Sequence, residues 1–338
     1  MTDDALTDDA LNSLPKAELH LHIEGTLEPE LAFELAAGNG IELPYATVEE
    51  LSAQYDFDDL QSFLDLYYAT MAVLRTREDF AELTRRYLRR AHAQGVRHAE
   101  LFFDPQAHTS RGVAFDDVVD GIGDALDEAE RDLGMSGGLI LCFLRDQPVD
   151  SAEEALTAGL RRTDRIVGVG LDSAEVGYPP SLFEGVYARA RAAGLHAVAH
   201  AGEEGPPAYV REALDLLHAE RIDHGIRSIE DPELVARLAE ERIPLTVCPL
   251  SNVRLQATPD LRDHPLHRLD AAGVRVTVNS DDPAYFGGYV GQNFAAVRDA
   301  LGLSADQARR FARTSIEASF ASDARKTELL AELDRWRA

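Results

Sequence analysis

Cysteine is scarce in this chain, and long hydrophobic runs are absent. Only 2 cysteines occur among 338 residues, too few for a disulfide framework or a cysteine-rich zinc site. We therefore expect a protein of the reducing cytoplasm. No stretch of about 18 apolar residues is present, so we expect no transmembrane helix. The first four residues (MTDD) are acidic where a secretory signal carries positive charge.

Basic residues are outnumbered, and lysine is nearly missing. Lys and Arg total 33 against 60 Asp and Glu, which gives a net charge of −27. This negative charge excludes most nucleic-acid binding, because nucleic acids bind to basic surfaces. It also disfavours binding to anionic membranes. We expect no nucleic-acid or membrane partner, and the sequence leaves the oligomeric state open. The only lysines are Lys16 and Lys326.

Apolar runs typical of strands alternate with amphipathic helical patterns along most of the chain. Eight such runs occupy residues 17–23, 97–103, 138–144, 165–171, 195–200, 220–224, 243–248 and 274–280. This alternation predicts a parallel sheet, because each parallel pair of strands needs a crossover connection. Eight units in roughly 270 residues match a (β/α)8 barrel of the TIM type.

The remaining segments are expected to extend this barrel. The gap between the first two strands is too long for one crossover, so the helical patterns at 29–37 and 58–73 predict an insertion that caps the barrel mouth. Residues 290–337 predict two or three closing helices. No Pro- or Ser-rich linker divides the chain, so we expect one domain over residues 13–338. An acidic, disordered-like tail is expected at residues 1–12.

Two histidines mark the end of the first predicted strand. His20 and His22 are two residues apart and therefore point to the same face of a strand, together with Glu18 and Glu24. At about 6–7 Å apart by strand rise, two imidazoles can converge on one metal ion. Taken alone, the pattern fits a pair of hydrogen-bonded histidines without a metal equally well.

Three more polar clusters follow later strands. Residues 200–204 (HAGEE), 223–225 (DHG) and 279–283 (NSDDP) stand where predicted strands end, on the face where barrel enzymes build active sites. With the first strand, they supply the candidate metal ligands His20, His22, His200 and Asp281. Three nitrogens and one oxygen without sulfur favour Zn2+ and also permit Fe2+ or Mn2+. Neither lysine lies near the fourth strand, so a metal pair bridged by a carboxylated lysine is excluded, and one ion is the simpler interpretation.

Candidate proton-transfer and substrate groups lie beside these ligands. Glu203 comes three residues after His200 and is a candidate general acid, with an exposed loop carboxylate as the alternative. His224 can orient or deprotonate a metal-bound water, or else be a core histidine at the end of the sixth strand. Asp281 and Asp282 are adjacent, so we expect one to bind metal and the other to bind substrate.

Four motifs carry a family resemblance. Residues 15–22 (PKAELHLH), 200–203 (HAGE), 223–225 (DHG) and 280–283 (SDDP) resemble, in order and spacing, the adenosine/adenine deaminase family of the amidohydrolase superfamily. The similarity extends over about residues 12–335. It implies the same (β/α)8 barrel, one zinc ion per chain and a small purine substrate.

The resemblance also implies a role for each site residue. The expected zinc ligands are His20, His22, His200 and Asp281. Glu203 is expected to protonate N1 of the purine, His224 to help activate the attacking water, and Asp282 to bond N7. Addition of water at C6 pushes electron density onto N1, so an acid has to stand opposite the attacking oxygen.

The residue at position 24 indicates whether adenosine or adenine is the expected substrate within this family. Adenosine deaminases typically carry Asp two residues after the second histidine, where it contacts ribose, whereas this chain has Glu24. The extra methylene pushes the carboxylate into the space of the sugar. Segments 169–175, which contains Ser173, and 282–289 resemble the adenine deaminase branch. We expect hydrolysis of adenine to hypoxanthine and ammonia in purine salvage, with Glu24 and Ser173 among the substrate contacts.

Other functions are compatible with the motifs. Adenosine or another 6-aminopurine can be the substrate, the chain can be a different metal-dependent barrel hydrolase, or the barrel can bind metal without catalysis. The last alternative is disfavoured by Glu203 and Asp282, because a metal site without catalysis needs neither.

Overall fold

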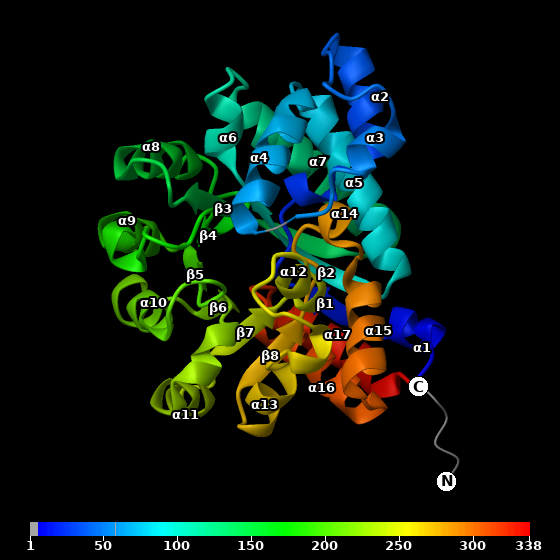
Figure 1. Cartoon of the computed structure of the whole chain (residues 1–338), viewed down its shortest axis with the longest axis vertical. Coiled ribbons are helices and arrows are strands. Elements are labelled where there is room, and N and C mark those ends of the chain that lie inside the picture. The colour runs from blue at the N-terminus through cyan, green and yellow to red at the C-terminus, as the bar shows by residue number, and fades with distance from the viewer. Residues whose placement is uncertain (1–5, 58) are drawn as a thin grey trace.

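Eight parallel strands form one barrel in the computed structural model of the chain, which describes residues 6–57 and 59–338 (Figure 1). The strands are β1 (Lys16–Glu18), β2 (Val96–Phe103), β3 (Ser136–Leu144), β4 (Ile166–Asp172), β5 (His196–Ala201), β6 (Arg221–His224), β7 (Pro244–Val247) and β8 (Arg275–Val278). They are hydrogen-bonded in sequence order, and every pairing is parallel. The predicted (β/α)8 barrel is confirmed.

The first strand is shorter than its sequence pattern predicts. Regular pairing with β2 covers only Lys16–Glu18, and isolated bridges to β2 and β8 continue the strand through His22. The Asp281 N–H donates to the His20 carbonyl (3.1 Å), and the His22 N–H donates to the Asp281 carbonyl (3.1 Å). Backbone groups after residue 18 are thus shared with β8, which closes the barrel and places both histidines beside Asp281.

Helices connect the strands and form the outer ring of the barrel (Figure 1). They are α5 (Arg77–Ala93), α7 (Phe115–Leu133), α8 (Val149–Gly159), α9 (Glu184–Ala192), α10 (Pro207–Glu212), α11 (Pro232–Glu240) and α13 (Leu266–Ala271). In α7, Val118 and Ile122 stand on one buried face at helical spacing, and the helix ends at Gly134 in the left-handed conformation (φ 64°) that glycine adopts without strain. Over the described residues, no helix is both long and apolar enough to cross a membrane.

An insertion covers the carboxyl-terminal end of the barrel, as predicted. It comprises α2 (Pro29–Asn39), α3 (Val48–Ser52) and α4 (Leu60–Thr70), and the short helices α6 (Pro105–Thr109), α12 (Pro249–Arg254) and α14 (Pro283–Phe286) follow β2, β7 and β8. Phe63 of α4 packs on Phe286 of α14, with ring centroids 4.6 Å apart, and Tyr55 stacks on Tyr285 at 4.7 Å. These aromatic contacts hold α4 over the barrel mouth. Of the predicted segment 58–73, residue 58 lies outside the described residues.

The two ends of the described chain pack against each other. Three helices close the barrel as expected: α15 (Val290–Leu301), α16 (Ala305–Ala318) and α17 (Asp323–Arg335). The predicted tail at residues 1–12 differs in its second half, where α1 (Asp8–Ser13) forms with Leu11 fully buried. Trp336 Nε1 donates to the Ala10 carbonyl (3.1 Å), and these tertiary contacts order a segment that composition alone describes as polar. Residues 1–5 lie outside the described residues.

Candidate active site

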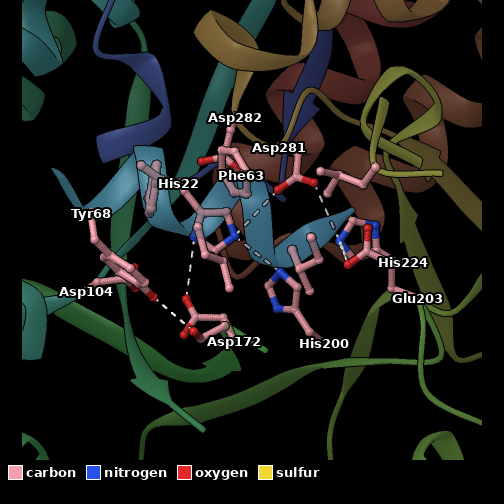
Figure 2. Close-up of a pocket in the computed structure, with 15 residues that line it drawn as sticks. His22, Phe63, Tyr68, Asp104, Asp172, His200, Glu203, His224, Asp281 and Asp282 are labelled. Atoms are coloured by element: carbon pink, nitrogen blue, oxygen red, sulfur yellow. Dashed lines mark hydrogen bonds and ion pairs between the residues drawn. The ribbon is translucent and has the colours of Figure 1, made fainter. Parts of the chain in front are cut away.

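Three histidines and one aspartate converge at the carboxyl-terminal end of the barrel, and Figure 2 shows three of them, His22, His200 and Asp281. His20 and His22 follow β1, His200 belongs to β5, Asp281 follows β8, and all four are buried. The Nε2 atoms of His22 and His200 are 3.2 Å apart. Asp281 Oδ1 lies 3.3 Å from His20 Nε2 and 3.6 Å from His22 Nε2. The fold thus brings together all four residues that the sequence nominates as metal ligands.

The chemistry of this cluster fits a cation. His20 Nε2 has no hydrogen-bond partner, and one donor atom from each of His20, His200, His224 and Asp281 lies within 4.8 Å of the others. Burial acts to raise the pKa of Asp281, but the neighbouring imidazoles, His20 foremost, hold it well below its ordinary value. Imidazole nitrogens without partners around a carboxylate are the donors that a zinc-type ion takes.

A polar chain behind the cluster fixes the orientation of His20. Its Nδ1 lies 3.0 Å from Thr246 Oγ1, and that hydroxyl donates to Asp223 Oδ1 at 2.7 Å. Asp223 Oδ2 also lies 3.7 Å from His200 Nδ1. Partners of this kind on the far ring nitrogen fix the tautomer of a metal-binding histidine and leave its Nε2 free for the ion. Asp223 belongs to the motif 223–225, but the motif alone predicted no role for it.

Three residues at the rim adopt left-handed backbone conformations although none is glycine. They are Ser173 (φ 69°), His224 (φ 59°) and Asp281 (φ 64°). Each such residue costs about 1–3 kcal/mol and persists only where surrounding contacts hold it, a situation that clusters at functional sites. All three follow or end a strand, so the sharp turn aims each side chain into the barrel mouth instead of along the sheet.

Glu203 is buried beside His224 and is not the exposed loop carboxylate of the alternative interpretation. Its Oε2 lies 3.5 Å from His224 Nε2, and its Oε1 accepts a hydrogen bond from Asn252 Nδ2 at 3.2 Å. Burial, and then the negative charge of Asp281, raise the pKa of Glu203 well above its ordinary value. Burial also lowers the pKa of His224 well below its ordinary value. The arrangement therefore offers a carboxylic acid next to a neutral imidazole.

The backbone that carries Glu203 is held by another carboxylate, Glu175. Glu175 Oε1 accepts from the Gly202 N–H at 2.7 Å, and Oε2 accepts from the N–H groups of residues 203, 204 and 205 at 3.1, 2.8 and 2.7 Å. A Cβ atom on Gly205 would lie 2.4 Å from Glu175 Oε1, so glycine is needed for this close approach. One side chain thus satisfies four consecutive amides and fixes the loop that aims Glu203.

Replacement of Glu175 by Gln should lower kcat while metal content stays unchanged. In the glutamine side chain, an NH2 group takes the place of one carboxylate oxygen. This NH2 group only donates, so it cannot accept from the backbone N–H groups that Glu175 binds. Displacement of a reacting group by about 1 Å can cost on the order of 10²-fold, and we expect a loss of roughly 10- to 10²-fold in steady-state kinetics. Glu204→Gln on the same loop is the matched control. Equal rates for the two variants would show that the loop does not depend on Glu175.

A small cavity opens beside the histidine cluster under α4. Its described lining includes Leu60, Phe63, Leu64, Tyr67, Tyr68 and Leu255 on the apolar and aromatic side. The polar side comprises His22, Asp104, Asp172, Ser173, His200, Glu203, His224, Asp281 and Asp282. Asp104 and Asp172 lie on one side of the cavity and Glu203 and His224 on the other (Figure 2).

The sequence-predicted substrate residues lie in different places relative to this cavity. Asp282 lines it, with Oδ1 buried and without a hydrogen-bond partner. Ser173 also lines it, and its hydroxyl is 3.0 Å from the Tyr68 hydroxyl. Glu24 is not among the lining residues: it begins a short 3-10 helix (Glu24–Thr26), and its Oε1 accepts from the Asp104 N–H at 3.1 Å. The predicted shared face of residues 18–24 is therefore broken at residue 24, where the strand has ended.

Besides Asp223, four residues of the site have no role predicted from the motifs. Asp104 directly follows β2 and Asp172 ends β4, so the strand-end rule that found the other clusters was a usable signal for both. Asn252 on α12 and Glu175 in the loop after β4 carry no comparable marker. Their roles follow only from contacts across the barrel mouth.

An eight-stranded parallel barrel with a buried His/Asp cluster and a carboxylic acid at its carboxyl-terminal rim defines a metal-dependent hydrolase of the amidohydrolase type. Residues 15–336 match the model of the adenosine deaminase family. The chain belongs to that family, which confirms the resemblance seen in the motifs.

Close relatives within the family are named adenine deaminases. The adenine deaminase of Streptomyces coelicolor is 62% identical over 331 residues, which cover 97% of each chain. The crystal structure of adenine deaminase from Arthrobacter aurescens has 60% identity and a TM-score of 0.94, with 96% of this chain and 99% of that chain covered. An amidohydrolase from Burkholderia ambifaria, solved with bound Zn, has 29% identity and a TM-score of 0.89, with 99% and 94% covered.

Proposed function

We propose that this protein is an adenine deaminase, which hydrolyses adenine to hypoxanthine and ammonia in the purine salvage of the cytoplasm. The observation that carries the proposal is that buried Glu203 stands beside the His/Asp cluster, 3.5 Å from His224, and lines the same partly aromatic cavity. Identities of 57–62% to eight adenine deaminases over almost the whole chain support adenine as the substrate.

We assign one zinc ion per chain to the histidine cluster. The ligands are His20, His22, His200 and Asp281, whose nitrogen and carboxylate donors suit Zn2+. When bound, the ion lowers the pKa of water toward neutrality and thereby supplies hydroxide for attack on C6. The bound Zn of the 29%-identical amidohydrolase supports this choice of metal.

The other residues of the site bind and protonate the purine. Glu203, in its acid form, donates a proton to N1 as electron density arrives there from the attacked C6. His224, as a neutral base 3.5 Å from Glu203, takes the proton of the attacking water. Asp282 faces N7, which has a lone pair and no hydrogen, so its carboxyl group donates in the acid form. Ser173 lines the wall on which the rest of the ring lies.

An assay of product formation tests the proposed function. Purified protein should release ammonia from adenine and form hypoxanthine in equal amounts, with adenosine and N6-methyladenine measured on the same preparation. Preference for adenosine would place the chain in the other branch of the family. Release of ammonia from none of these would leave a barrel without deaminase activity and overturn the proposal.

One metal ion per chain should copurify with the protein, and His20→Ala should lose it. The variant removes one of four ligands and also the imidazole that Thr246 orients. His196→Ala is the matched control, because His196 lies at the opposite end of β5 from the site. Elemental analysis together with activity decides the outcome. Two ions per chain, both needed for activity, would contradict the single-metal assignment.

A further inference from the structure

One buried carboxylate of the cavity has no role in the mechanism above. Asp104, 2% exposed, lines the cavity at the end of β2, and its Oδ1 has no hydrogen-bond partner. In the described part of the chain, no Lys, Arg or His forms an ion pair with it. Burial, and then the neighbouring carboxylate of Asp172, raise the pKa of Asp104 well above its ordinary value, which favours its acid form. The carboxyl oxygen without a hydrogen is then a buried acceptor, and a buried acceptor without a donor is costly, so the site is built for a ligand that brings one.

Each neighbouring carboxyl group faces a histidine, unlike Asp104. Glu24 Oε1 accepts from His108 Nε2 at 2.7 Å and from the Asp104 N–H at 3.1 Å, and it lies behind the cavity wall. Asp172 Oδ2 lies 3.5 Å from His22 Nδ1, where it orients that ring. Of these three carboxylates, Asp104 is the one that both lines the cavity and lacks a basic partner.

Placement of the purine brings its five-membered ring to this wall. This step rests on the proposed function, with C6 at the metal and N1 at Glu203. In a purine, N1 lies on one side of the line through C6 and N3, and the five-membered ring lies on the other. Figure 2 shows Glu203 and His224 on one side of the cluster and Asp104 and Asp172 on the other. The edge that carries N9 therefore faces Asp104.

We propose that Asp104 is a specificity-determining residue that accepts a hydrogen bond from N9–H of the free base. Only the base has a hydrogen on N9, because a nucleoside has the sugar carbon there. Bound adenine satisfies the buried carboxylate, whereas a nucleoside leaves it without a donor and also crowds it with ribose. The selectivity for base over nucleoside therefore resides at the end of β2.

The test compares adenine with 9-methyladenine, which lacks the N9 hydrogen but is almost as small. The parent enzyme should favour adenine in kcat/KM by about 10- to 10²-fold, the range for leaving a buried acceptor unsatisfied. Asp104→Ala should lower kcat/KM for adenine by that factor and change the value for 9-methyladenine only a few-fold. Asp104→Leu keeps the bulk but removes both oxygens, and it should reduce the adenine-to-9-methyladenine ratio as well.

Controls separate this inference from the proposed function. Metal content and thermal unfolding establish that each variant is folded, and Asp104→Leu, which leaves no cavity of the size left by Ala, serves if Asp104→Ala does not fold. Glu204→Gln, which is not among the lining residues, should leave the ratio unchanged. A parent that deaminates adenine, with Asp104 variants that change both substrates equally or neither, overturns the role of Asp104 alone. A parent inactive on adenine overturns the proposed function and this inference with it.

Discussion

Glu203→Gln should retain its metal ion and lose nearly all turnover of adenine. Glutamine fills the same space and can still accept from Asn252 Nδ2, which lies 3.2 Å from Glu203 Oε1, so the loop and the cavity stay in place. It has no acidic proton, and N1 of the purine is then left without a donor as water adds at C6. General acid–base groups contribute on the order of 10²–10⁴-fold, and we expect a fall in kcat of this size in single-turnover and steady-state assays.

The adjacent carboxylate provides the comparison that isolates this effect. Glu204→Gln changes the same charge on the same loop, but Glu204 is only partly buried and does not line the cavity. The kcat of Glu204→Gln should stay within a few-fold of that of the parent. If the kcat of Glu203→Gln also stays within a few-fold, Glu203 is not the proton donor, and another residue of the site supplies the N1 proton.

The barrel and its functional edge were predictable because both depend on local patterns. The fourth strand was predicted at 165–171 and is β4 at Ile166–Asp172; the fifth was predicted at 195–200 and is β5 at His196–Ala201. Parallel strands all direct their carboxyl ends to one rim. Polar residues placed after several strands, such as His200 and Asp281, therefore had to meet once the strand boundaries were known.

The parts that escaped prediction depend on contacts between distant segments. Period-two alternation placed Glu24 on the face of His20 and His22, but strand pairing stops at His22 and a 3-10 helix begins at Glu24. Glu175 acts on amides 27 to 30 residues further along the chain. Asn252 reaches Glu203 from a helix after β7. No local pattern encodes such distances, which are set by loop geometry at the barrel mouth.

Adenine should be deaminated with far higher kcat/KM than adenosine by the parent enzyme. Aromatic residues of α4 line the cavity, and with the purine placed as proposed, Asp104 and Asp172 line the wall at its five-membered ring. A nucleoside would have to place ribose against these carboxylates and would leave a buried acceptor unpaired. Sites that hydrogen-bond a substrate N–H can reject an analogue without it on the order of 10⁴-fold. Initial rates of hypoxanthine and inosine formation at low substrate concentration measure this ratio.

Glu24→Asp should lower the ratio of kcat/KM for adenine to kcat/KM for adenosine, because Glu24 supports the backbone of Asp104. Glu24 Oε1 accepts from the Asp104 N–H at 3.1 Å and from His108 Nε2 at 2.7 Å. Shortening the side chain by one methylene withdraws this support, so the backbone of Asp104 gains freedom to move away from N9 and to admit a sugar. Because the carboxylate of Asp104 itself is retained, the change in the adenine-to-adenosine ratio should be smaller than in Asp104→Ala. A ratio equal to that of the parent would show that selectivity does not depend on Glu24, and a change larger than in Asp104→Ala would place the direct contact with the base at Glu24 instead.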